Sequence, residues 1–130
     1  MWILALASCS DEVSPPPREI PYVLVRLPRS ARAYYSRETG MQHTMLQVRF
    51  EMAPRDLAIF ASRLPCRLGP ARDGPPEFAT VGTNDRAWYA PERARRHRGC
   101  QHHRGILDAS FLVDLTDPAR LTVYAVVALE

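Results

Sequence analysis

The sequence contains no lysine, so its 17 basic residues are all arginines, set against 14 acidic residues and giving a net charge of +3. A balance this modest does not by itself indicate nucleic-acid binding. No apolar run approaches the roughly 20 residues that a transmembrane helix requires, which excludes a spanning helix. The glycine-rich phosphate loop, the G-x-S-x-G nucleophile motif and the H-E-x-x-H zinc motif are also missing, so no reaction class is indicated.

The first residues carry the most specific short motif of the chain. The apolar run Trp2–Leu6 leads into Leu6-Ala7-Ser8-Cys9, and a polar stretch with Pro15-Pro16-Pro17 follows at once. An apolar core that ends in small residues is typical of a signal segment. The chain resembles small, uncharacterised bacterial lipoproteins. The resemblance implies that a peptidase cuts before the cysteine of this lipobox and that the new N-terminal Cys9 carries lipid.

This resemblance implies a cellular location and a division of the chain into three segments. Residues 1–8 are expected to be a truncated lipoprotein signal segment, residues 9–20 a lipidated cysteine with a disordered tether, and residues 21–130 a single domain. The expected location is the periplasmic side of the cell envelope, and Ser10 implies the outer membrane if the bacterium is Gram-negative. No basic residue precedes the apolar run. Two alternatives therefore stay open: a start further upstream, or a cytosolic protein with a wrongly assigned start.

The cysteine count agrees with export. Cys9, Cys66 and Cys100 are the three cysteines, and an odd number in an exported protein needs an explanation. Lipidation of Cys9 leaves one pair, Cys66 and Cys100, which we expect to form a disulfide in an oxidising compartment. The alternative is two unrelated thiols, because sequence alone does not place the two Cα atoms within bridging distance.

Four segments have the pattern of β-strands. Residues 44–52 alternate strictly between apolar and polar, which predicts a strand buried on one side, and residues 31–36 are expected to be its hairpin partner. A second hairpin is predicted from residues 110–116 and 121–129, joined by a proline-containing turn. The short apolar run at residues 22–27 predicts either an edge strand or a continuation of the tether.

One main helix is predicted to begin at Pro54 and to end at Pro65. Its apolar stripe has the right width to cover the apolar face of the preceding strand. The predicted core cluster consists of Phe50, Leu57, Phe60, Leu64, Val113 and Val123. The predicted fold class is therefore α+β, with an antiparallel sheet of four to five strands and one main helix packed on one face.

The region between helix and C-terminal hairpin is expected to be rich in loops. A short extended piece is predicted at Phe78–Val81, and Trp88-Tyr89 is expected to anchor the region to the core, with a ligand groove as the alternative role. Pro91–Arg98 is predicted to be a short helix that ends at Gly99.

A histidine-rich motif follows this predicted helix. His97, Cys100, His102 and His103 form H-x2-C-x-H-H, and imidazole nitrogens and thiolates are good zinc ligands. Adjacent His102 and His103 do not easily face one ion, and an exported Cys100 would be oxidised. The alternatives are a metal site that uses His97, His102 and His103, and a solvated polar turn beside a disulfide.

Arginines surround the same histidines. They are Arg93, Arg95, Arg96, Arg98 and Arg104. Arginine binds phosphate well, so anionic head groups are the natural partner on a lipid-anchored protein. The alternative is an exposed helix with spare charge. No aromatic residues are interleaved, which argues against nucleic acid.

The leading functional hypothesis is a non-catalytic envelope domain, tethered to the membrane by lipid, that binds another envelope component such as an anionic lipid or a protein. It predicts no cofactor and no catalytic residue. The alternatives are a small metal-binding protein or enzyme that uses the His97–His103 region, and a cytosolic protein whose start is wrongly assigned.

Overall fold

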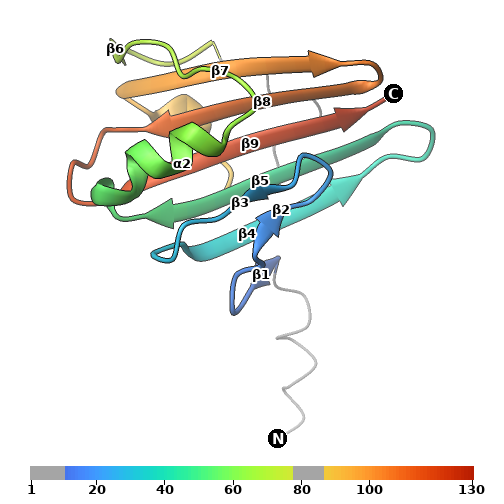
Figure 1. The fold of residues 1–130 in the computed structure, drawn as a ribbon, viewed down its shortest axis with the longest axis horizontal. Helices are drawn as coiled ribbons and strands as arrows, with labels where there is room; N and C mark the ends of the chain where they lie inside the picture. Colours follow the sequence, from blue (N-terminus) through green and yellow to red (C-terminus); the bar gives the residue numbers. More distant parts are fainter. Residues whose placement is uncertain (1–10, 78–86) are drawn as a thin grey trace, which may run out of the picture.

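A computed structural model describes residues 11–77 and 87–130 of the chain, and one antiparallel sheet dominates it (Figure 1). The strand order in this seven-stranded sheet is β1-β4-β5-β9-β8-β7-β6, and β2 pairs with β3 in a separate hairpin. The strands are β1 Glu12–Val13, β2 Glu19–Ile20, β3 Val25–Arg26, β4 Arg32–Thr39, β5 Thr44–Met52, β6 Arg72–Asp73, β7 Arg96–Arg104, β8 Leu107–Asp114 and β9 Leu121–Leu129. The expected lipobox with Cys9 and the predicted strand Phe78–Val81 lie outside the described residues.

The predicted α+β class is wrong, because the described chain is mostly β. Its α-helix, α2 (Leu57–Arg63), is one short segment that continues the 3-10 turn η1 (Pro54–Asp56). Four or five strands were expected, whereas the main sheet alone has seven. The strands that the prediction omits include several of two residues, which are too short to show an alternating pattern. No described helix is long and apolar enough to cross a membrane.

The predicted helix Pro91–Arg98 is also wrong. Only Pro91–Arg93 forms a 3-10 turn, η2, and the arginine- and histidine-rich residues that follow are β7. From His97 to Arg104 this strand pairs with β8. Because β7 lies near the edge of the sheet, most of its side chains are partly or fully exposed and polar. An edge strand of this kind lacks the apolar alternation by which a strand is recognised.

The first face of the sheet carries the main core, and the predicted cluster is confirmed there. Phe50, Phe60, Val113 and Val123 are completely buried, and Leu57 and Leu64 pack against them half-buried. The rings of Phe50 and Phe60 meet edge to face, with centroids 5.6 Å apart. Helix α2 therefore covers this face as expected (Figure 1).

Residues 11–20, which were expected to belong to a disordered tether, make contacts with the folded domain. In the described part of residues 9–20, Glu12 pairs with Tyr35 of β4, and Ile20 is completely buried in the main core. The β2–β3 hairpin lies beside α2 over the first face (Figure 1). Isolated apolar residues such as Ile20 do not stand out in a proline-rich sequence, so the tether prediction missed this contact.

A second, smaller cluster covers the opposite face. Tyr89, Leu112, Tyr124 and Val126 are buried together, with Trp88 against them. The expectation that Trp88-Tyr89 anchors this part of the chain to the core is confirmed. Burial, together with the neighbouring Tyr124 phenol and the charge of Glu92, raises the pKa of Tyr89 well above its usual value.

Candidate binding cleft

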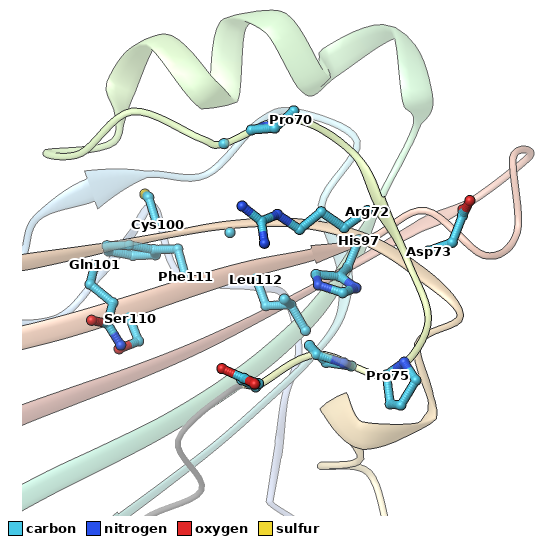
Figure 2. A pocket seen from close by; sticks show the side chains of 14 residues that line it. Pro70, Arg72, Asp73, Pro75, His97, Cys100, Gln101, Ser110, Phe111 and Leu112 are labelled. Carbon is cyan, nitrogen blue, oxygen red and sulfur yellow. The ribbon is translucent and has the colours of Figure 1, made fainter.

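A hollow lies at the outer edge of β7 (Figure 2). The loop after α2 returns to this edge, where Arg72 lies opposite His97 in register. The Gly69 N–H donates to the Gly99 carbonyl at 3.0 Å, and the Gly74 N–H donates to the Arg95 carbonyl at 2.8 Å. The loop thus follows the strand edge and then arches away, which leaves a cleft of about 650 Å³.

A disulfide holds the loop against β7, and the predicted pairing is confirmed. Cys66 and Cys100 are bonded, with their Cα atoms 5.9 Å apart. The Arg98 side chain adds a second clamp, because its Nε donates to the Gly69 carbonyl at 2.8 Å. The first part of the loop is therefore held to β7 by one covalent bond and by hydrogen bonds.

The polar lining comes from three strands. His97 and Gln101 project from β7, Ser110 from β8 and Arg72 from β6. In the register of the sheet, Gln101 lies opposite Ser110, and His97 lies opposite Asp114. Side chains two residues apart on a strand share a face, so His97 and Gln101 lie on the same face as Ser110.

The floor of the cleft is apolar, and the outer wall combines prolines with charged residues. Gly99 stands between His97 and Gln101 on the same face, and Leu112 is its partner in β8. Without a side chain at Gly99, the buried Leu112 side chain borders the space. Pro70 and Pro75 line the other side (Figure 2). Polar groups that converge on an apolar floor are the usual composition of a small-molecule site.

The predicted metal ligands are not brought together. Because β7 is a strand, His97 and His103 lie on one face, and His102 shares the other face with Cys100. His97 and His103 are six residues apart, which is roughly 20 Å along a strand. His103 Nδ1 pairs with the Asp108 carboxylate, and Cys100 is taken by the disulfide. Across the described ranges, no three His, Cys, Asp or Glu residues are placed to hold a metal ion.

The arginine run does not form one basic helix face. Arg96 forms an ion pair with Asp73, with Nη1 and Oδ1 at 3.2 Å, and Arg98 is bonded to the Gly69 carbonyl. Alternation along β7 places Arg96, Arg98 and Arg104 on the face opposite to His97. The arginine in the cleft lining is Arg72, which the sequence patterns did not indicate because its strand, β6, has only two residues.

A second hollow of about 460 Å³ lies near η1. Apolar side chains such as Leu57, Leu115 and Leu121 line it, together with Arg96. The guanidinium of Arg96 is already paired with Asp73. This hollow therefore offers less specific chemistry than the cleft at the β7 edge.

Comparison of the chain with protein-family models, with curated proteins and with solved structures finds no match in any of the three.

Proposed function

We propose that this chain is a lipid-anchored domain of the bacterial cell envelope, and that its role is to bind another molecule in the cleft at the β7 edge. The observation that carries this proposal is the disulfide between Cys66 and Cys100. Structural disulfides persist in exported proteins and are rare in the reducing cytosol of mesophiles. The bond therefore supports export and argues against the cytosolic alternative.

The lipobox supplies the second support. Cys9 is the one cysteine left when Cys66 and Cys100 are paired, and it follows the apolar run and the small residues that a lipoprotein signal requires. The Ser36 N–H donates to the carbonyl of Asp11 at 3.2 Å, so the folded domain begins within two residues of Cys9. Two residues span at most about 7 Å. A lipid on Cys9 would hold the domain close against the membrane instead of on a long tether.

A binding role follows from the composition of the cleft. Its volume of about 650 Å³ is in the range of small-molecule sites. Arg72, His97, Gln101 and Ser110 provide polar groups around the apolar floor at Leu112. The alternative of a metal centre at His97–His103 has less support, because strand alternation divides those histidines between two faces.

The anchoring part of the proposal is tested by cell fractionation. The protein is expressed from its own gene in a bacterium, beside a Cys9→Ser variant and a control variant, Ser10→Ala. The wild-type protein and Ser10→Ala should sediment with membranes and be released by detergent but not by high salt, because acyl chains anchor by burial in the bilayer. Cys9→Ser should be soluble. A wild-type protein that is soluble, or a Cys9→Ser protein that stays in the membrane, contradicts the proposal.

A further inference from the structure

The cleft at the β7 edge has a defined ligand chemistry. We propose that it binds a small molecule with a single anionic group, a carboxylate or a phosphate monoester, joined to an apolar body of about the size of a phenyl ring. This inference rests on the proposed binding role and adds the class of ligand. It can be tested on soluble protein, independently of the lipid anchor.

The oxyanion is assigned to the Arg72 end of the cleft. Figure 2 shows Arg72 extending across the cleft between Pro70 and Leu112. Within the described ranges Arg72 forms no ion pair, and the neighbouring Asp73 carboxylate, which also lines the cleft, is paired with Arg96. A guanidinium presents a planar fork of donors that matches carboxylate and phosphate oxygens. The positive charge of Arg72 is therefore available to a ligand.

His97, which also lines the cleft, has a polar atom without a hydrogen-bond partner. It lies opposite Arg72 in the register of β6 and β7. Its Nδ1 atom is buried and has no hydrogen-bond partner. Buried polar atoms in proteins are nearly always paired, so each exception needs an explanation. Because Nδ1 is enclosed by protein atoms, a ligand oxygen held by Arg72 would reach it only after the imidazole ring turns toward the cleft.

The apolar body is assigned to the middle of the cleft. Gly99 is two residues from His97, or about 7 Å along the strand, and leaves the Leu112 side chain as the floor. Gln101 and Ser110 face each other one further step along, about 13 Å from His97. Along β7 the order is therefore His97, the apolar floor and the neutral polar pair, and the Arg72 side chain extends across the cleft above the floor (Figure 2).

Glu77 limits the charge of the ligand. Its exposed side chain lines the wall beside Pro75 and Pro76. A carboxylate there disfavours a second negative group on the ligand, because like charges repel in a partly desolvated site. The cleft should therefore prefer one anionic group to two.

The test uses defined probes and a Cys9→Ser protein in NMR titrations of backbone amides. The probes are 3-phenylpropionate, phenyl phosphate, the neutral 3-phenylpropanol and 3-(4-hydroxyphenyl)propionate. We expect 3-phenylpropionate or phenyl phosphate to bind with a Kd on the order of 1 mM and to shift amides at His97 and Leu112. The neutral alcohol should bind at least about tenfold more weakly, because it lacks the charge-assisted hydrogen bond. The tighter of the two anions shows whether the oxyanion is a carboxylate or a phosphate, and either result supports the proposal.

The matched variants are Arg72→Gln and Arg93→Gln, which lose the same charge from exposed positions, with Arg93 lying outside the cleft lining. Arg72→Gln should weaken binding of the anion about tenfold or more, and Arg93→Gln should change it less than about twofold. The added hydroxyl of 3-(4-hydroxyphenyl)propionate should strengthen binding a few-fold in the parent protein and not in Ser110→Ala.

Three results would overturn the inference. The first is equal binding of the alcohol and the anion, the second is equal weakening by the two arginine variants, and the third is the absence of shifts in the cleft at about 20 mM probe. Each result refutes the ligand class and leaves the lipid anchor untouched. A failure of lipidation at Cys9, conversely, does not affect any of these titrations.

Discussion

Removal of the Cys66–Cys100 disulfide should destabilise the domain by an amount that the loop length sets. The bond joins residues 34 positions apart. In the chain-entropy model a closed loop of this size restricts the unfolded chain by about 4 kcal/mol. For a domain with a total stability of about 5–15 kcal/mol, this is a large share. We therefore expect Cys66→Ala/Cys100→Ala to remain folded but to unfold at a much lower urea concentration.

Urea unfolding of the double variant and of the parent protein, with and without reductant, measures this loss. The parent protein in reductant should match the double variant, and the reductant should not change the double variant further. The m-value of the double variant should be at least as large as that of the parent protein, because the unfolded chain without the cross-link exposes more surface. A loss below about 1 kcal/mol would refute the reasoning, because the disulfide would then do little to restrict the unfolded chain.

Further predictions concern the core, one turn and the loss of stability at high pH. Phe60→Ala should lower the free energy of unfolding by about 3–5 kcal/mol. Arg55→Ala, at an exposed position, should lower it by less than about 0.5 kcal/mol. Equal urea midpoints for the two variants would contradict the packing of α2 on the sheet. Gly40→Ala should cost more than Gly105→Ala, because φ is positive at both but a Cβ at Gly40 would lie 1.6 Å from a backbone oxygen; thermal melts compare them. Burial raises the pKa of Tyr34 from 10 to about 12. The neutral phenol therefore contributes stability that is fully present below pH 10 and is lost as the pH rises toward 12. The loss is at most about 1.4 kcal/mol per pH unit. Tyr34→Phe should flatten that decline in urea melts, and an unchanged slope would contradict it.

The central strands could be predicted from sequence. The predicted ranges 44–52 and 121–129 have the same bounds as β5 and β9. Both are interior strands, and β5 alternates between the buried first face and a partly polar second face. The helical spacing of Leu57, Phe60 and Leu64 identified Phe60 as a residue that α2 places on the sheet, and Phe60 is buried there.

The edges of the sheet could not be predicted. The strand β7 carries polar residues on both faces, so its sequence resembles a solvated helix as much as a strand. The strands β1 and β6 have two residues each, and they form because their neighbours β4 and β7 offer free backbone groups. Such pairings depend on long-range contacts that no local pattern records.

The candidate site was predicted only in part. The pairing of Cys66 with Cys100 followed from counting cysteines, and it is confirmed. His97 was noticed for metal chemistry, whereas it lines the cleft beside Arg72. Arg72 and Ser110 belong to no motif, and only the register of β6, β7 and β8 brings them to one cleft.

The mass of the native protein tests the central claim most directly. Mass spectrometry of protein purified from membranes determines the N-terminal residue, its modification and the state of the remaining thiols. The account predicts Cys9 as the first residue, a diacylglyceryl group on its sulfur, and a mass lower by two hydrogens for the Cys66–Cys100 bond. A soluble protein that retains Met1 and has free thiols at Cys66 and Cys100 would contradict both export and anchoring.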